Sequence, residues 1–405
     1  RGRAAERRAA RVSLAVHDAV VEMKVEVAII GAGPGGSTLA AFLARRGIGV
    51  VLIDRDRFPR DKLCGEFLSY DALPILDHLG LLPRLDEFDA PAISRCRVVG
   101  RRDIYEFEFP RPARGVSRML LDDLLFRCAV TNGALDFSGW TAIALDPNRV
   151  EIERNGERTT IDARVVVGAW GRWGRFDVQL GRRFVRDRAH RNFGFKRHYR
   201  EAEATSDTID LYSFRGGYLG VSPVEGGITN ICGLVQAGRL RGLKGRWDSF
   251  VTTIREEEPH LDRMYAAHKA AQDDFLSSDP VIFRSRSAVE RGIVMVGDAS
   301  GVVDPLTGNG MAMAIQSALL AAPAIRSLLT AADRTAAEDG YRSAHHRMFT
   351  SRIRWSRQVA KLLSNPRLLD VALRLGRGAG PGRFLLARTR ADAAAVERTA
   401  SAEFW

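Results

Sequence analysis

The clearest hydrophobic pattern in the chain lies near its N-terminus, where a β-branched run at 25–30 is followed by a glycine-rich turn. A helix-forming stretch at 37–46 comes next, Gly47 ends it, and a second apolar run occupies 49–54. Continuous apolar runs of this length are typical of strands in a parallel sheet, because both faces of such a sheet are covered. The order of strand, turn, helix and strand therefore predicts a parallel βαβ unit.

The pattern changes in the middle of the chain. Segments such as 208–214 (TIDLYSF) and 216–235 (GGYLGVSPVEGGITNICGLV) alternate apolar with polar residues and contain glycine pairs. This alternation is typical of antiparallel strands joined by hairpins. An α/β fold with an inserted antiparallel sheet is therefore predicted.

The C-terminal part is predicted to be helical. The stretch 353–363 (IRWSRQVAKLL) has an amphipathic face. The apolar residues at helical spacing in it are Trp355, Val359, Leu362 and Leu363. A further helix is expected after it, with Asn365 as the cap, Pro366 at the first helical position and Gly376 as the terminator.

The net charge of the chain is +12, and the basic residues are unevenly placed. Residues 341–390 contain twelve Arg or Lys and a single acid, Asp370. Such a region is either a solvated basic face or a docking surface for something acidic, such as a reductase, an acyl-carrier protein or a lipid headgroup. Its helices could also cover a substrate entrance or contact a membrane peripherally. No nucleic-acid-binding motif accompanies the charge, so nucleic acid is not a predicted partner.

Four cysteines, Cys64, Cys96, Cys128 and Cys232, are scattered without a CxxC pair. Their spacing argues against a disulfide framework, a zinc ribbon or an iron–sulfur cluster, so no metal site is predicted, and free thiols fit a reducing, cytoplasmic location. No apolar run is expected to span a bilayer. Residues 1–22 lack the uninterrupted apolar core of a signal peptide and are expected to be an extension outside the fold.

The glycine-rich turn carries a nucleotide-binding pattern. Gly31, Gly33 and Gly36 fit G-x-G-x-x-G, in which the first glycine permits the sharp turn, the second lets the backbone approach a pyrophosphate and the third allows close helix–strand packing. Asp54, eighteen residues after the third glycine, ends the next strand and could accept hydrogen bonds from a ribose 2′-hydroxyl. The motif predicts a dinucleotide but does not separate NAD from FAD. NADP is disfavoured because Asp54 would repel a 2′-phosphate, although the adjacent Arg55 weakens this argument.

A second glycine-rich turn follows much later. The segment 292–300 (GIVMVGDAS) predicts a strand ending next to Asp298, whose carboxylate could bind a ribityl or ribose hydroxyl. Pro305, Gly308 and Gly310 then interrupt regular structure before a predicted helix at 311–322. Amides at the N-terminus of that helix would point at an anion-forming group. An ordinary loop–helix junction would have the same composition.

Taken together, the two turns, 31–36 (GAGPGG) and 297–318 (GDASGVVDPLTGNGMAMAIQSA), resemble the FAD-binding fold shared by aromatic hydroxylases, flavin halogenases and geranylgeranyl reductases. The resemblance extends in pieces over about 23–330 and implies that one long FAD molecule contacts both turns. Two further segments resemble this family: 58–73 (FPRDKLCGEFLSYDAL), where a Cys-Gly pair approaches the flavin, and 116–129 (VSRMLLDDLLFRCA), whose leading arginine contacts FAD.

The resemblance implies a set of FAD-binding residues and a domain organisation of the glutathione-reductase type. The implied cofactor residues are Gly31, Gly33, Pro34, Gly36, Asp54 and Arg55 for the ADP half, Cys64, Gly65 and Arg118 in the two further segments, Asp298 for the ribityl chain, and Pro305, Gly308, Asn309, Gly310 and Met311 beside the flavin ring. The predicted parts are an N-terminal extension (1–22), a discontinuous Rossmann-like FAD-binding domain (23–75, 113–177 and 281–335), an antiparallel-sheet substrate domain (76–112 and 178–280) and a basic helical C-terminal region (336–405).

The sequence departs from the family in two places. Trp170 stands where the family usually has the Asp of a GADG motif that serves FAD and pyridine nucleotide. This difference argues against direct reduction by NAD(P)H and favours an external electron donor. The halogenase signature W-x-W-x-I-P is absent, because Trp170 and Trp173 are spaced differently and no Ile-Pro follows, so halogenation is disfavoured.

Four residues are candidates for catalysis, each with an alternative. Cys64 is either a proton donor near the flavin or a small buried residue without a role. Glu66 is either an acid/base or a solvated acid. Lys196 and His198 lie two apart on a presumed strand and so share a face; they could bind an anionic group of the substrate or could be surface residues.

These observations predict an FAD-dependent oxidoreductase, since a flavin performs the chemistry while the protein positions it. A monooxygenase that hydroxylates a bulky aromatic or hydrophobic substrate, free or carrier-bound, through a C4a-hydroperoxyflavin is preferred. The alternatives are an ene reductase like the geranylgeranyl reductases, a flavin halogenase, and a non-enzymatic flavin electron carrier or assembly factor. Aromatic residues of the middle segment would roof the substrate in the first case, or would simply fill a core: Phe193, Phe195, Tyr212, Phe214 and Tyr218.

Overall fold

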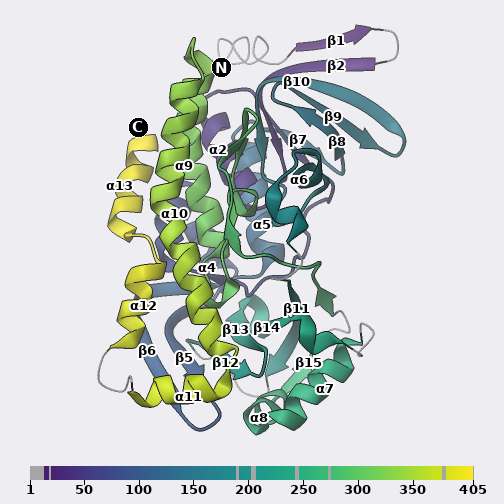
Figure 1. Cartoon of the computed structure of the whole chain (residues 1–405). Coiled ribbons are helices and arrows are strands. Elements are labelled where there is room, and N and C mark those ends of the chain that lie inside the picture. The colour runs from purple at the N-terminus through teal and green to yellow at the C-terminus, as the bar shows by residue number, and fades with distance from the viewer. Residues whose placement is uncertain are drawn as a thin grey trace.

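The computed structural model of the chain describes residues 13–17, 20–187, 191–201, 207–241, 246–271, 275–375 and 380–404. Two large sheets lie at opposite ends of the molecule, and the long helices α9 and α10 run beside both (Figure 1). The prediction of an α/β fold with a Rossmann-like part, an antiparallel sheet and C-terminal helices is confirmed.

The first sheet has the order β18-β19-β10-β2-β3-β7, with β1, β8 and β9 added at its margins. The pairs β2–β3, β2–β10, β3–β7 and β10–β19 are all parallel, so each requires a crossover connection in place of a hairpin. The strands are β1 (Ser13–His17), β2 (Val20–Ile30), β3 (Val50–Asp54), β7 (Leu135–Ser138), β8 (Thr141–Asp146), β9 (Arg149–Arg154), β10 (Glu157–Gly168), β18 (Val289–Glu290) and β19 (Ile293–Met295).

The predicted βαβ unit is β2, α2 (Pro34–Arg45) and β3, and its helix starts three residues earlier than expected. Proline suits the first position of a helix, since it has no N–H to leave unpaired and its φ is already helical. Helices α2, α5 (Arg118–Thr131) and α9 (Gly310–Thr330) pack in one buried apolar cluster with β2 and β3.

The second sheet has the order β15-β11-β14-β13-β12-β5-β6-β4, with β16 beside β11. Its pairs are antiparallel except β5–β12, which joins two distant segments of the chain in parallel. Its strands are β4 (Phe67–Leu68), β5 (Ala92–Val99), β6 (Ile104–Gly115), β11 (Asn192–Glu201), β12 (Thr208–Phe214), β13 (Gly217–Val224), β14 (Ile228–Gln236), β15 (His268–Ala270) and β16 (Leu276–Ser277). Helices α7 (Trp247–Glu257) and α8 (Pro259–Ala266) cover one face of it.

The N-terminal segment departs from the expectation that residues 1–22 lie outside the fold. Strand β2 begins at Val20, and β1 pairs with it from Ser13 opposite Lys24 to His17 opposite Val20. Strand β3 pairs with β2 only from Val27 onward, so the earlier part of β2 has a free edge that β1 covers. Residues 1–12, 18 and 19 lie outside the described part of the chain.

Helix α9 corrects the expectation that no apolar run could span a bilayer. By length and composition it could cross one, but 67% of its most apolar window is buried inside the protein. It packs against α2 on one side and α10 (Thr335–Leu363) on the other, and Ala312, Ile315 and Leu319 are fully buried. The apolar residues of α9 therefore form part of the protein core.

The C-terminal helices follow the predicted pattern and fold back along the molecule. Helix α11 (Pro366–Leu375) starts at the expected proline, and the side chain of Asn365 accepts a hydrogen bond from Leu368 N at 3.3 Å. Gly376 lies outside the described residues. Helices α12 (Pro381–Thr389) and α13 (Ala393–Phe404) complete the chain. One of the twelve basic residues, Arg352, is buried and pairs with Asp71 at 3.2 Å, so the basic region is only partly a surface.

Candidate active site

A cavity of about 780 Å³ joins the two glycine-rich turns. Its walls come from 30–36, the loop 53–67, the segment 169–176, one face of the second sheet and the segment 296–314. Two turns more than 260 residues apart in the sequence therefore contact the same space. Such an elongated site, with a helix N-terminus at each turn, fits one long phosphate-bearing ligand.

The three motif glycines of the first turn are needed for different structural reasons. Gly31 has a φ of +107°, and a Cβ on it would lie 2.3 Å from the carbonyl oxygen of Ala169. A Cβ on Gly36 would lie 1.9 Å from the carbonyl oxygen of Gly31. Gly33 differs, because its Cβ would face the cavity and meet only Nη2 of Arg118, at 3.8 Å. Gly31 and Gly36 are therefore required by the close backbone contacts, whereas Gly33 leaves room for a ligand.

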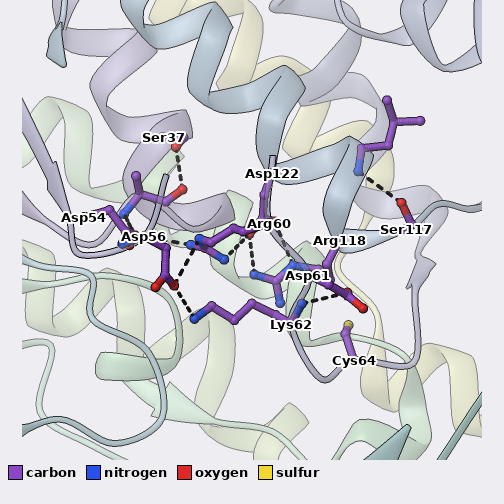
Figure 2. Close-up of polar contacts among 12 residues, drawn as sticks. Ser37, Asp54, Asp56, Arg60, Asp61, Lys62, Cys64, Ser117, Arg118 and Asp122 are labelled. Carbon is purple, nitrogen blue, oxygen red and sulfur yellow. Dashed lines mark hydrogen bonds and ion pairs between the residues drawn. The ribbon is translucent and has the colours of Figure 1, made fainter. Parts of the chain in front are cut away.

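Asp54 lies at the start of a chain of ion pairs (Figure 2). Its carboxylate accepts hydrogen bonds from Ala32 N at 2.7 Å and Asp56 N at 3.0 Å, and Arg60 pairs with it at 3.2 Å. Arg60 also forms an ion pair with Asp122, at 2.9 Å. Asp54 lines the cavity, and carboxylate oxygens accept more than one hydrogen bond, so a ribose hydroxyl can still bind there.

Arg118 completes that chain. Its guanidinium makes two hydrogen bonds of 2.7 Å to Asp122, one turn later on α5, and it lines the cavity beside Gly33. This bidentate pair holds the arginine in one orientation. The sequence motif pointed to Arg118 but missed Arg60 and Asp122. The i, i+4 spacing of Arg118 and Asp122 was a usable signal for the second of them.

The second turn places Asp298 and four of its five expected neighbours on the cavity. Asp298 lies in a short 3₁₀ turn (Gly297–Ala299) that follows β19. Within the described residues no hydrogen bond reaches its carboxyl group, which faces the cavity. Burial raises the pKa of that carboxyl, and Arg172, Arg286 and Arg118 oppose the shift. A partly exposed acid that lines the cavity and accepts no hydrogen bond from the described residues is suited to bind a hydroxylated ligand chain. The four cavity residues of the turn are Pro305, Gly308, Gly310 and Met311.

Asn309 departs from the expected place beside the ring. It is absent from the described residues that line the cavity, and its side-chain amide donates a hydrogen bond to the carbonyl oxygen of Thr389. The residue is fully buried. Its amide thus ties the turn to the end of α12, a contact between segments 80 residues apart that the motif could not indicate.

Cys64, Gly65 and Glu66 line the cavity on its second-sheet side. Burial raises the pKa of the Cys64 thiol, which keeps it protonated at neutral pH. A Cβ on Gly65 would meet nothing within 4 Å. The backbone turns sharply at Glu66, whose φ is +55°. A thiol and an open backbone position thus face the same space as the glycine turns.

Glu66 is fully buried, which contradicts the alternative of a solvated acid. Its two carboxylate oxygens contact Lys196 Nζ and His198 Nε2, each at 2.7 Å, and one also accepts from Arg118 N at 2.9 Å. Lys196 and His198 do share a face of β11, as their spacing predicted. Lys196 is 1% exposed, which contradicts the surface alternative for it.

Neither Lys196 nor His198 is among the described residues that line the cavity, so the geometry does not favour direct binding of a substrate anion. Lys196 also pairs with Asp61 at 2.6 Å. Together these contacts hold the loop 61–66 against the second sheet. The two residues act as positioning groups for the cavity wall that carries Cys64.

Glu66→Gln is expected to lower the free energy of unfolding by about 3 kcal/mol, because Lys196 stays buried with less compensating charge. Chemical denaturation measures the loss, and a double-mutant cycle with Lys196→Met should show coupling above about 1 kcal/mol. The matched control is Glu106→Gln, which breaks an exposed pair with Arg95 and should cost less than about 1 kcal/mol. Equal losses in the two variants would contradict this role for Glu66.

The predicted aromatic roof is largely wrong in its orientation. Tyr218 lines the cavity, but the other four aromatic residues pack on the opposite face of the second sheet, where Phe195 lies 5.6 Å from Phe250 of α7. Side chains alternate between the faces of a strand, so the cavity receives the intervening positions. Apart from Tyr218, those positions are mainly small or aliphatic: Gly194, Ile209, Leu211, Gly220, Cys232 and Leu234.

Tyr218 and Asp304 form a buried pair at the edge of the cavity that no motif indicated. The Tyr218 hydroxyl donates to Asp304 Oδ1 and accepts from Leu306 N at 3.0 Å. Each residue is 4% exposed. Burial raises the pKa of Asp304 to about 7, against the opposing hydrogen bond from Tyr218. This carboxyl is therefore partly protonated at neutral pH.

Trp170 lines the cavity at the position where an aspartate was expected. Its indole Nε1 donates to Asp177 Oδ2 at 3.3 Å, and Asp177 pairs with the buried Arg182 at 2.9 Å. A Cβ on Gly168 would lie 2.3 Å from the indole ring, so the glycine makes room for it. The cavity thus has an indole where the resemblance led us to expect a carboxylate.

The family described as FAD binding domain matches residues 24–356, which is more than half of the chain. The chain belongs to this family. It is a flavin-dependent oxidoreductase with FAD as its cofactor, so the predictions of enzyme class and cofactor are confirmed.

Curated relatives of this FAD-binding protein carry different activities. It is 26% identical over 362 residues to a tryptophan 2-halogenase of Chondromyces crocatus, covering 83% of this chain and 67% of that protein. It is 27% identical over 377 residues to a menaquinone reductase of Mycolicibacterium smegmatis, covering 86% and 87%. The structure of a myxobacterial chondrochloren halogenase superposes with a TM-score of 0.75 at 20% identity, covering 94% and 97%. At that identity the likeness shows the fold alone.

Proposed function

We propose that this FAD-binding protein is a reductase that saturates a carbon–carbon double bond in a bulky aliphatic substrate. The observation that carries this proposal is the largely aliphatic face of the second sheet over the cavity, where Ile209, Leu211 and Leu234 and small glycines accompany Tyr218 and Phe67. The aromatic roof that favoured hydroxylation of an aromatic substrate lies on the other face. A reductase is also among the relatives that align over most of both chains.

The FAD-binding residues are part of the proposal. Gly31, Gly33, Pro34, Gly36, Asp54 and Arg55 would hold the ADP half, Asp298 the ribityl chain, and Pro305, Gly308, Gly310 and Met311 the ring, with Cys64, Gly65 and Arg118 beside it. We add Arg172, a cavity residue whose charge acts on Asp298. These positions support the proposal because the described cavity contains them all.

Saturating a double bond consumes one hydride and one proton. Reduced FAD, when bound, supplies the hydride, and the protein must deliver the proton. Tyr218 is the proposed donor, because it lines the cavity and contacts Asp304. Burial raises the pKa of Tyr218 well above its ordinary value, so the phenol alone is a weak acid. When Asp304 is protonated, it can instead donate to the Tyr218 oxygen, which frees the phenol proton for the substrate, and it can then replace that proton.

Tyr218→Phe should therefore slow substrate reduction by about 100-fold or more, the usual range for loss of a general acid. FAD content and the rate of flavin reduction by dithionite should stay near those of the unchanged protein, because the ring remains in the wall. Single-turnover kinetics under anaerobic conditions measure both steps. An unchanged rate of substrate reduction would remove Tyr218 from this role.

The reaction class is tested with the holoprotein reduced by dithionite without oxygen. A menaquinone with an unsaturated side chain and geranylgeraniol are the probes, and flavin reoxidation is followed by absorbance. The proposal expects reoxidation coupled to a product that gains two hydrogens. Reoxidation only after oxygen is added, with an oxygenated product, would support the monooxygenase instead, and halide incorporation would support a halogenase. Either outcome overturns the proposal.

An external electron donor is also proposed, supported by Trp170 in the cavity. Direct reduction of the bound flavin by NADH or NADPH should be at least about tenfold slower than reduction by an added reductase system, since no carboxylate stands at that position to help place the nicotinamide. Stopped-flow mixing measures both rates. Rapid saturable reduction by either nucleotide would contradict this proposal.

A cytoplasmic location is proposed on the four free thiols, which suit a reducing compartment. Redox-sensitive cysteine labelling in intact cells tests it, and disulfide formation in the natural protein would contradict it.

A further inference from the structure

Exposed apolar side chains gather at the end of the molecule formed by α11, α12 and the β5–β6 hairpin. Large exposed apolar residues there are Ile104 (61%), Leu368 (55%), Val371 (54%) and Phe384 (51%). Arg374 of α11 pairs with Asp103 at 2.8 Å, and Gly382 N of α12 donates to Tyr105 Oη at 3.2 Å. Both helices lie beside the β5–β6 hairpin (Figure 1).

Each of the two helices has the same outward arrangement. On α11 the exposed positions are Arg367, Leu368, Val371 and Arg374, and on α12 they are Arg383, Phe384, Ala387 and Arg388. In both cases apolar side chains stand between arginines. We name these eight residues together with Ile104 the C-terminal face.

The outward apolar residues are not needed to fold these helices. The inner sides already bury Leu369 at 1% exposure and Leu386 at 6%. Leu369 belongs to the same apolar cluster as Ile209, Leu234 and Leu306, which line the cavity. On α11 the C-terminal face is therefore the outer side of a helix whose inner side packs against the apolar layer that walls the cavity.

Acidic groups only partly offset the positive charge of this face, although Glu108 is exposed on β6 two positions beyond Glu106. Asp103 is paired with Arg374, and Asp370 is buried with its carboxylate near Gly100 and Arg102. Glu106, farther along β6, pairs with Arg95. Arg367, Arg383 and Arg388 make no ion pair within the described residues, and Arg388 lies over the rings of Trp355 and Phe384.

We propose that the C-terminal face docks on an anionic lipid bilayer. Short helices that present apolar residues flanked by arginines are suited to lie in the headgroup region, with the apolar side chains inserted and the arginines near phosphate. Each basic residue near an anionic surface adds favourable energy. Four separate apolar side chains protrude, and a fluid surface accommodates such protrusions without a matching recess.

This proposal is independent of the reaction class and is tested by flotation of the FAD-loaded full chain with lipid vesicles. Vesicles of phosphatidylcholine with phosphatidylglycerol should carry the protein upward, pure phosphatidylcholine should carry much less, and high salt should release it. The key variant is Leu368→Gln with Val371→Gln and Phe384→Gln. It should lower the partition coefficient at least about tenfold.

The matched control is Val178→Gln, which changes a valine about as exposed as Val371 (60% against 54%) on α6 (Arg175–Gln179), away from this face. It should float like the unchanged protein. Flavin absorbance and thermal unfolding verify that every variant remains folded. Failure of the unchanged protein to float, or equal flotation of the triple variant, would overturn the proposal, as would binding to an acidic acyl-carrier protein with no affinity for vesicles.

Discussion

Replacing Gly36 with alanine is expected to abolish FAD binding and to lower the free energy of unfolding by about 3 kcal/mol or more. The added Cβ would lie 1.9 Å from the carbonyl oxygen of Gly31 and 3.1 Å from Ala169 Cβ. Gly31 cannot move away, because it is already packed closely against the backbone carbonyl of Ala169. Chemical denaturation and flavin content of the purified protein measure the two effects.

Gly33→Ala is the matched control for that variant. The same methyl group at Gly33 would meet only Arg118 Nη2, at 3.8 Å, so the fold should lose no more than about 0.5 kcal/mol. FAD content should nevertheless fall sharply, because the methyl occupies space proposed for the pyrophosphate. If Gly33→Ala keeps its full FAD content, the first turn does not hold the phosphates. If it unfolds like Gly36→Ala, the distinction between the two glycines is wrong.

Asp304→Asn is expected to stabilise the protein in a pH-dependent way. Burial raises the pKa of Asp304 from 3.8 to about 7, so the folded protein holds this proton more tightly than the unfolded chain does. The stabilising contribution of the protonated carboxyl is complete below pH 3.8, falls as the pH rises, and is lost once the pH passes about 7. Three units at about 1.4 kcal/mol each give a difference of up to about 4 kcal/mol.

The measurement is the free energy of unfolding of both proteins between about pH 4 and pH 8. Asparagine can still accept from Tyr218 and Leu306, so the two proteins should have similar stability at the acidic end, and the variant should be the more stable at the alkaline end. Asp333→Asn is the control, because Asp333 is exposed and accepts only from Thr335 at the start of α10. A constant difference across this range would mean that Asp304 is ionised throughout.

Much of the fold and the cofactor could be predicted from the sequence. The βαβ unit, the antiparallel middle sheet and the C-terminal helices follow from local periodicity, since burial on one or both faces leaves a repeat of two or 3.6 residues. The FAD assignment depended on glycines at fixed spacing, because each one allows a backbone approach that a side chain prevents. These features depend on residues close together in the sequence, so they could be predicted from it.

The candidate site was predictable only in part. The spacing of Lys196 and His198 showed that they share a face, but their common partner, Glu66, is 130 residues from Lys196. The aromatic positions of the second sheet were visible, but a strand pattern does not say which face meets the cavity. Tyr218 alone of the five aromatic candidates lies there.

The sequence by itself therefore determined the elements, the two turns and the family, because each depends on residues close together in the chain. Only the tertiary structure decided which side chains surround the ligand space and which partners hold the segments around it. Arg60 with Asp122, Tyr218 with Asp304, and Asn309 with Thr389 come from segments 62, 86 and 80 residues apart. Packing of the loop after β3 against α5, and of β13 and α12 against the second turn, brings them together, and local periodicity contains no information about that packing.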